Sequence, residues 1–306
     1  MSRSGSSLRV GVSTPWNLAR LPGQDQQRCL AAIADGGLDF VFTADHVSFH
    51  DGSGIDGPVH LAAMGGMEPR LDLYLGVFLL ALRHPMVAAR QIASLAEMAP
   101  GRLTVGVGVG GEDRHEFEVC GVDPATRGRR TDAALAQVRA LLSGETVDGD
   151  GDQFDFIGGR IRPVPDPPVP FVVGGRSDAA LRRAGRLGDG WLATWCSVDR
   201  FRQGVELVER VGADREVAWR HGIQTWVGVG ADPDEGRHHV AKRMTAFYKI
   251  DFSAFARYTP VGNPEQIAAF LRPYVEAGAT SVGLTPCGAN GDAETEGMAR
   301  VAELLR

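Results

Sequence analysis

The sequence predicts a (β/α)8 barrel, and three observations lead to this fold class. The chain has 306 residues, a length typical of one such barrel. Short and nearly continuous apolar runs alternate with amphipathic stretches, as expected for buried parallel strands covered by helices. Eight of these runs can be counted, which is the strand number of the barrel. An open doubly wound sheet competes, but no G-x-G-x-x-G stretch follows the first predicted strand.

Four predicted βα units occupy the first half of the chain. Their strands are apolar runs at residues 8–13, 40–43, 71–80 and 103–109. Glycines end the first helix, and prolines near the first turn begin the second and third. These helices, together with the fourth, are predicted at residues 24–34, 58–67, 85–98 and 129–142. The Gly- and Asp-rich stretch 50–57 and the polar stretch 110–128 are expected to be loops.

The second half supplies the other four units and two insertions. Its strands are predicted at residues 169–173, 191–194, 223–229 and 281–284, and its helices at 177–188, 199–211, 264–277 and 293–305. Residues 144–168 are rich in Asp, Gly and Pro, and a small hairpin is expected at 154–161. The insertion at 230–260 is polar and helix-like. We expect one domain over residues 1–306, with residues 1–7 as a disordered tail.

Composition narrows the possible partners. The formal net charge is −6, whereas a general nucleic-acid or anionic-membrane binder needs a basic surface. The four cysteines have no C-x-x-C spacing, and no stretch of eighteen apolar residues is present. The N-terminus is polar and has no signal-peptide pattern. These features predict a cytoplasmic protein that acts on a small molecule and binds no nucleic acid, membrane or metal.

The turn at Gly174-Gly175-Arg176-Ser177 is the most informative candidate site. It follows a predicted strand and begins a predicted helix. Ser177 is a good N-cap, and the glycines allow backbone N–H groups to point at one spot beside the positive end of the helix dipole. Such a spot binds anions, most often phosphate, although two glycines can also simply turn the chain.

Other strand ends carry further polar residues. Asp45-His46 follows the second strand, Gly110-Gly111-Glu112-Asp113 the fourth and Thr194-Trp195 the sixth. The first strand has no His-x-His for a metal, and the seventh offers no early carboxylate for a glycosidase pair. A phosphate cradle, glycine-lined strand ends and one histidine are typical of a cofactor-binding barrel. Asp45-His46 could instead only order a loop, and Glu112-Asp113 could be solvated.

Five stretches in order resemble one known family over about residues 10–305. They read DFVFTADHV, LYLGVFLLALRHP, GRLTVGVGVGGEDRHEFEVCGV continuing to RGRRTDAAL, PVPFVVGGRSDAALRRAGRLGDGW and VGNPEQIAAFLRPYVEAGATSVGL. The chain is similar to the luciferase-like flavin- and coenzyme F420-dependent oxidoreductases. The resemblance implies a (β/α)8 barrel with insertions, which agrees with the strand count above.

The resemblance also implies roles for individual residues. The Gly174 to Ser177 turn would hold the cofactor phosphate, and His46 would lie near the reactive centre of the ring. A non-proline cis peptide at Phe78-Leu79 would bulge against the ring. Glu112 would donate a proton, although this loop is one residue longer than in relatives and has Gly111 where flavin users often have Trp. The remaining expected cofactor contacts are Asp45, which is frequent in F420 users, and Gly108, Val109, Gly110 and Thr194.

These expectations combine into one predicted function. The protein would be an oxidoreductase that transfers a hydride between coenzyme F420 and a small organic substrate. An FMN-dependent monooxygenase that receives reduced flavin from a separate reductase is the alternative. A non-catalytic barrel that binds flavin or F420 is an alternative of another class. Relatives also suggest a homodimer.

Overall fold

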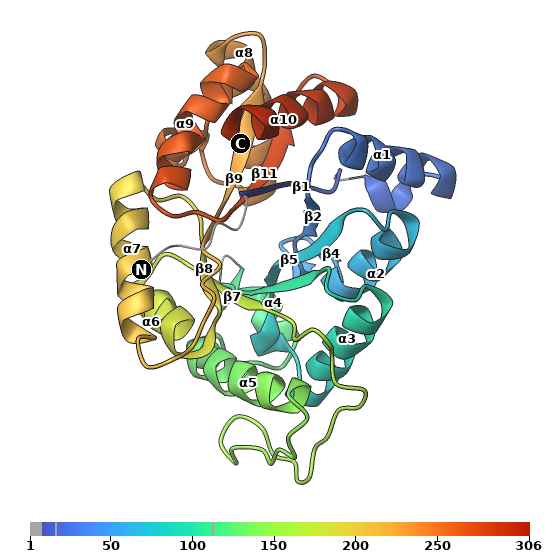
Figure 1. The fold of residues 1–306 in the computed structure, drawn as a ribbon, viewed down its shortest axis with the longest axis vertical. Helices are drawn as coiled ribbons and strands as arrows, with labels where there is room; N and C mark the ends of the chain where they lie inside the picture. Colours follow the sequence, from blue (N-terminus) through green and yellow to red (C-terminus); the bar gives the residue numbers. More distant parts are fainter. Residues whose placement is uncertain (1–7, 16, 112) are drawn as a thin grey trace. The chain divides into compact units, whose positions relative to one another are not determined.

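A computed structural model describes residues 8–15, 17–111 and 113–306, and it contains two compact units (Figure 1). The first unit runs up to Phe42 and resumes from Gly190 to Arg306, and the second unit is Thr43–Asp189. The expectation of one domain stays a prediction.

The first unit is built on a parallel sheet. Its strands lie in the order β8 (Gly190–Ala193), β9 (Gly222–Val229), β11 (Ser281–Cys287), β1 (Arg9–Ser13) and β2 (Phe40–Thr43). Short β10 (Val261–Gly262), which was not predicted, pairs with the end of β9. Central residues of these strands, such as Val10 and Leu284, are completely buried. The apolar runs therefore form buried strands, as the sequence predicts.

The α-helices of the first unit begin at side-chain caps, except the first, which follows Pro22 and has none. They are α1 (Gly23–Asp35), α7 (Val198–Val211), α8 (Pro233–Tyr248), α9 (Pro264–Glu276) and α10 (Gly291–Leu305), with 3₁₀ turns η1 (Leu18–Arg20), η4 (Phe252–Ala254) and η5 (Ala256–Tyr258). Asn263 and Gln266 form a reciprocal capping box at the start of α9. Helices α9 and α10 lie side by side (Figure 1). Helix α8 confirms the helix-like insertion.

In the second unit, three parallel strands lie in the order β5 (Asp72–Phe78), β6 (Leu103–Val107) and β7 (Phe171–Gly174). Its predicted helices are present as α2 (Gly57–Met67), α3 (Pro85–Met98), α5 (Arg127–Leu142) and α6 (Asp178–Leu187), with 3₁₀ turns η2 (Leu80–Leu82) and η3 (Pro124–Thr126). Helices α3 and α5 lie side by side (Figure 1).

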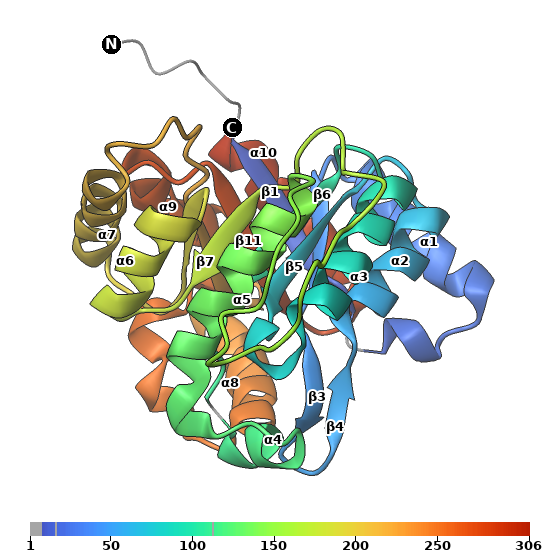
Figure 2. The same cartoon turned by 90° about the horizontal axis from the view of Figure 1, so that it is seen from below.

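Two predicted loops contain regular structure instead. Strands β3 (His46–Phe49) and β4 (Ser53–Ile55) form an antiparallel hairpin where residues 50–57 were expected to be a loop. Helix α4 (Arg114–Val119) lies beside this hairpin, within the stretch expected to be polar loop (Figure 2). Asp113 caps α4 by accepting from the His115 N–H, and Phe117 is fully buried. A cap and one apolar anchor are enough for a short helix when tertiary contacts hold it.

The hairpin expected at residues 154–161 is a looser structure that begins earlier. Val147 and Gly159 form one isolated antiparallel bridge, and the Gly149 N–H donates to the Phe156 carbonyl at 2.7 Å. In chain order, the parallel strands β1, β2, β5 to β9 and β11 of the described residues and the helices that follow them have the arrangement of a (β/α)8 barrel. This is the predicted fold class.

Candidate functional site

Asp45 follows β2, and its carboxylate links three segments of the second unit. One oxygen accepts from the Gly57 N–H at the start of α2, and the other accepts from the Leu79 N–H after β5, both at 3.0 Å. The Arg83 guanidinium donates to both oxygens, at 2.7 and 2.8 Å. Asp45 is only 1% exposed. Both oxygens are therefore engaged by the protein, which favours the loop-ordering interpretation of Asp45 over direct cofactor contact.

Arg83 is a residue that the sequence interpretation missed. Besides its two bonds to Asp45, it donates to the Asp56 carboxylate at 3.2 Å and lies over the Phe78 ring at 4.5 Å. Its side chain is 10% exposed. A bidentate arginine–carboxylate pair forms two parallel charge-assisted hydrogen bonds, which hold both side chains in one orientation. Arg83 and Asp45 thus fix the segment after β5 against the start of α2.

His46 begins β3 and contacts Glu116 of α4. Its Nδ1 lies 3.1 and 3.3 Å from the two Glu116 carboxylate oxygens. Glu116 also accepts from the Val47 N–H at 2.7 Å and from the Ser48 N–H at 3.2 Å. The carboxylate therefore holds both the histidine ring and the backbone that carries it.

The pKa of Glu116 shows how this carboxylate is stabilised. Burial alone would raise the pKa, since Glu116 is 2% exposed, but the hydrogen bonds and charge of His46 and the N–H groups of Ser48 and Val47 bring it below its usual value. Nothing in the local sequence HEFE distinguishes Glu116 from a solvated helix residue. Its role depends on the packing of α4 against β3.

Glycines at the ends of β6 and β7 surround one side chain, that of Val77. A Cβ at Gly108 would lie 2.4 Å from Val77 Cγ2, and a Cβ at Gly174 would lie 3.1 Å from Val77 Cγ1. The approach at Gly108 is too close for a side chain unless Val77 moves, and the approach at Gly174 is tight. Val77 is the half-buried member of residues 73–81, whose other members are buried. It is thus the side chain at this strand end that a bound molecule could touch.

The predicted position of the cis peptide bond is wrong. The non-proline cis bond of the described residues is Gly76–Val77, not Phe78–Leu79. The pairing of β5 with β6 shifts its register between Leu75 and Phe78, so the bulge is centred on Gly76 and Val77. Phe78 itself is fully buried. The resemblance indicated the right strand but placed the bulge two residues too late.

The βα turn predicted from Gly174 to Ser177 is present. Strand β7 ends at Gly174, and the Ser177 hydroxyl caps α6 by accepting from the Ala180 N–H at 3.3 Å. Gly175 has φ +126°, and a Cβ there would lie 2.8 Å from the Ala180 Cβ, so the turn requires glycine. Arg176 and Ser177 are exposed. The geometry has the form of a phosphate cradle, whose use stays a prediction.

The remaining predicted site residues are Glu112, Val109, Gly110 and Thr194. Glu112 lies outside the described residues. Val109 and Gly110 follow β6 and are half-buried, and Gly110 has φ +62° with its would-be Cβ 2.9 Å from the Phe117 ring. Thr194 follows β8 in the first unit and is half-buried. The structure therefore places most predicted contacts at strand ends of the second unit, and Thr194 in the first.

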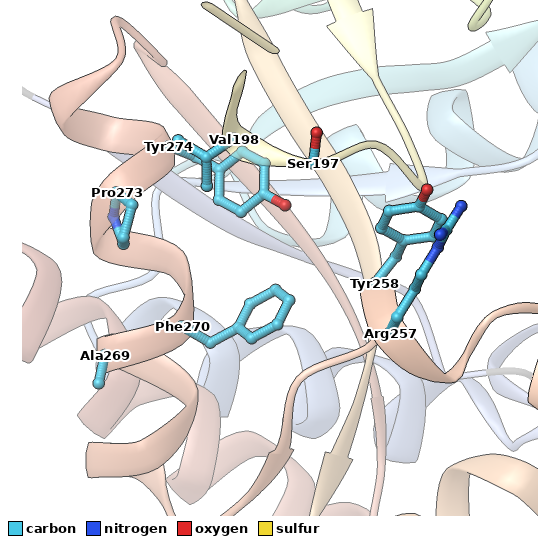
Figure 3. A pocket seen from close by; sticks show the side chains of 8 residues that line it. All are labelled: Ser197, Val198, Arg257, Tyr258, Ala269, Phe270, Pro273 and Tyr274. Carbon is cyan, nitrogen blue, oxygen red and sulfur yellow. The ribbon is translucent and has the colours of Figure 1, made fainter. Parts of the chain in front are cut away.

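A groove of about 480 Å³ occurs in the first unit (Figure 3). Its walls come from the start of α7, from η5 and from α9, through Ser197, Val198, Arg257, Tyr258, Ala269, Phe270, Pro273 and Tyr274. The Tyr274 hydroxyl donates to the Cys196 carbonyl at 2.7 Å, and the Arg257 guanidinium lies 4.4 Å from the Tyr258 ring centre. The groove lining thus contains none of the residues predicted to bind cofactor.

The described residues also bear on metal sites and membrane-spanning helices. Among the described residues, no group of three or more His, Cys, Asp and Glu side chains has a geometry that could hold a metal ion. Over the same part of the chain, every helix is too short or too polar to span a bilayer.

Comparisons with known proteins identify the family of this chain. A model of the family described as luciferase-like monooxygenase matches residues 8–259. An F420-dependent glucose-6-phosphate dehydrogenase of Beutenbergia cavernae is 37% identical over 165 residues, which are 52% of this chain and 48% of that protein. The chain spans about half the length of this and several other relatives that it matches. The family predicted from the five sequence stretches is confirmed.

Solved structures confirm the fold. An F420-dependent secondary alcohol dehydrogenase in complex with an F420–acetone adduct superposes with a TM-score of 0.84 at 18% identity, covering 98% of this chain and 100% of that one. The oxygenating constituent of a 3,6-diketocamphane monooxygenase from Pseudomonas putida, in complex with FMN, gives 0.75 at 14% identity and covers 97% of each chain. At these identities the likeness supports the (β/α)8 barrel alone.

Proposed function

The chain belongs to the luciferase-like monooxygenase family, and from this premise we propose that it is an oxidoreductase that uses coenzyme F420. It would transfer a hydride between F420 and a small organic substrate. The observation that carries the proposal is the glycine-lined surface around Val77 in the second unit, one of whose glycines, Gly174, also begins the turn to Ser177. A flat ring with a phosphate-bearing tail needs this combination of close backbone approach and anion binding.

Residues of the second unit would hold the cofactor. The Gly174 to Ser177 turn offers backbone N–H groups and the exposed Arg176 to the phosphate. Gly108 and Gly110 would lie along the ring system or its side chain, with Val77 against its face. When bound, F420 supplies the hydride chemistry, and the protein supplies orientation and proton transfer.

His46 would supply the proton transfer. Oxidation of an alcohol carbon by hydride removal releases the hydroxyl proton, which a base must accept. A histidine whose Nδ1 is held by a carboxylate keeps a defined ring orientation for that task. Glu112 remains a proposed proton donor, and Asp45 would act indirectly by fixing the Leu79 backbone and Arg83.

F420 is preferred to FMN because the glucose-6-phosphate dehydrogenase named above, which is 37% identical over 165 residues, is F420-dependent. The FMN-bound monooxygenase neighbour supports the alternative, in which a separate reductase supplies reduced flavin. A homodimer and a reductase partner rest on the family resemblance. A cytoplasmic location is supported by the four free cysteines.

Cofactor titration tests the proposal. The purified protein is titrated with F420 and, separately, with FMN, and fluorescence quenching is followed. We expect saturable F420 binding at micromolar or lower concentration and much weaker FMN binding. Tight FMN binding without F420 binding would contradict the proposal and favour the monooxygenase alternative. Absence of binding to both would favour a non-catalytic barrel.

A further inference from the structure

We propose that Glu116 is a positioning residue that fixes His46 in the tautomer protonated at Nδ1, so that Nε2 is the nitrogen that exchanges the proton of the reaction. The inference rests on the proposed function, because it concerns the base assigned there. It adds a residue outside the predicted site and a defined atom for the proton transfer.

The contacts of Glu116 are unusual for a residue of a six-residue surface helix. Its side chain is 3% exposed, and its carboxylate accepts from two consecutive backbone N–H groups, Val47 and Ser48, besides contacting His46. A buried carboxylate is costly unless donors surround it. Because the backbone N–H groups are fixed donors, the carboxylate stays ionised and its position is set independently of the histidine.

The ionised carboxylate determines what His46 Nδ1 can be. A carboxylate only accepts hydrogen bonds, so the nitrogen 3.1 Å from it must carry a proton. In the neutral ring, the lone pair is then at Nε2. The Phe49 ring, 4.2 Å from the imidazole centre, further limits ring rotation.

The hairpin and α4 are joined at a second point, which makes the arrangement rigid. The Asp113 carboxylate accepts from the His50 N–H at 2.7 Å while capping α4. Two carboxylates of one short segment thus hold both ends of β3. Consequently the Nδ1 contact does not depend on a single flexible side chain.

Other ionisable groups lie around His46 and Glu116. His50 and His115 face Asp113, and Cys120 lies within the field of Glu116 and Arg83. Glu116 is the carboxylate that contacts His46 Nδ1 directly. Removing its charge should therefore change the tautomer of the neutral His46 ring more than any change at the more distant groups.

A purely structural role for Glu116 is the competing explanation. The carboxylate could serve only to satisfy the Val47 and Ser48 N–H groups, with the histidine contact incidental. The two explanations differ in whether the tautomer of the imidazole depends on the Glu116 carboxylate, and nuclear magnetic resonance reports the tautomer directly. They can be separated without cofactor or substrate.

The experiment records imidazole nitrogen shifts of the ¹⁵N-histidine-labelled protein between about pH 5 and 8, a range that covers ordinary histidine titration. The chain has eight histidines, and a His46→Gln variant assigns the His46 signal. We expect the neutral ring to show the Nδ1–H tautomer. In Glu116→Gln, the amide oxygen can stay with the Val47 and Ser48 N–H groups, which turns the NH₂ group toward Nδ1, so we expect the neutral ring to shift toward the Nε2–H tautomer.

Glu118→Gln is the matched control, because Glu118 lies on the same helix with its side chain 54% exposed. It should leave the His46 signal unchanged. An Nε2–H tautomer in the unmodified protein would overturn the proposal even if Glu116→Gln failed to fold, as would an unchanged His46 tautomer in a folded Glu116→Gln. Failure of F420 binding in the titration above would instead contradict the proposed function and leave these shifts as expected.

Discussion

The turns that follow β7 and β8 have the same backbone plan but differ at one position. In each turn a residue with positive φ precedes a serine N-cap by two places, namely Gly175 before Ser177 and Trp195 before Ser197. Both serines accept from the N–H three residues later, at 3.3 and 3.2 Å. The turn itself is thus a shared device for starting a helix after a strand.

The two turns differ in the side chain at the positive-φ position. Gly175 offers only backbone to its surroundings. The Trp195 ring instead packs with Phe255 at 4.7 Å and Tyr248 at 5.2 Å between ring centres. The same turn therefore packs an aromatic side chain in the first unit, whereas in the second unit, where we propose phosphate binding, it presents backbone only.

Buried carboxylates of the two units show a similar contrast. Asp45 and Glu116 of the second unit each have three or more donors, and the pKa of Glu116 is lowered. Glu294 of α10 accepts from the Gly288 N–H and lies 3.3 Å from Arg243 Nη1, and burial raises its pKa. Asp45 and Glu116 of the second unit are therefore surrounded by hydrogen-bond donors, whereas the donors around Glu294 of the first unit do not fully offset the cost of burying its charge.

The largest expected effect is on stability, from Asp45→Asn. The change leaves the nearly buried Arg83 without its main counter-charge and places an amide N–H₂ beside donors. Removing one partner of a buried pair costs about 3–5 kcal/mol in the free energy of unfolding. Urea denaturation at pH 7 measures this.

Asp56→Asn is the matched control for Asp45→Asn. Asp56 is 39% exposed, makes one 3.2 Å contact with Arg83 and can still cap α2 as asparagine. We expect it to cost less than about 1 kcal/mol. Equal losses in the two variants would show that Asp45 is no more important than a surface partner of Arg83.

What the sequence alone can predict depends on how far apart in the chain the interacting residues are. The strands, most helices and the Gly174 to Ser177 turn follow from periodicity, apolar runs and caps, which are local signals. Helix α4 and strand β4 lie in stretches that were expected to be loops, because α4 and the hairpin are held together by tertiary contacts of Asp113 and Glu116.

The candidate site shows the same limit. Asp45 and His46 could be singled out because they end a strand. Their partners Arg83 and Glu116 are 38 and 70 residues away in the chain and look like ordinary surface charges. The register shift in β5 that moves the bulge to Gly76 and Val77 has no local signature either. Long-range partners and strand irregularities require the folded chain.

A second prediction uses the two serine caps to locate the anion site. Ser177→Asp retains a good N-cap but adds a negative charge beside the proposed phosphate, and should weaken F420 binding about tenfold, or about 1.4 kcal/mol. Ser177→Asn has the same size without the charge and should bind almost normally. Fluorescence titration provides the affinities.

Ser197→Asp makes the equivalent change in the turn that contains Trp195. We expect F420 affinity to remain within about twofold of the unmodified protein, since no phosphate is expected there. Equal weakening by Ser177→Asp and Ser197→Asp would contradict the distinction between the two turns. Gly175 is a poor target for this test, because any side chain there meets Ala180.

The smallest expected effect is in the pH dependence of stability, and its sign differs between the two units. The pKa of Glu116 is lowered in the folded protein, so its stabilising contribution is present above the unfolded value of about 4.3 and is lost as pH falls through the folded pKa. The pKa of Glu294 is raised, so its contribution is present below about 4.3 and is lost as pH rises through the folded pKa. The stability difference between the unmodified protein and Glu116→Gln should therefore increase with pH, whereas the difference for Glu294→Gln should decrease. Urea denaturation at several values between about pH 3.5 and 7 measures both slopes, and slopes of equal sign would refute the contrast between the two carboxylates.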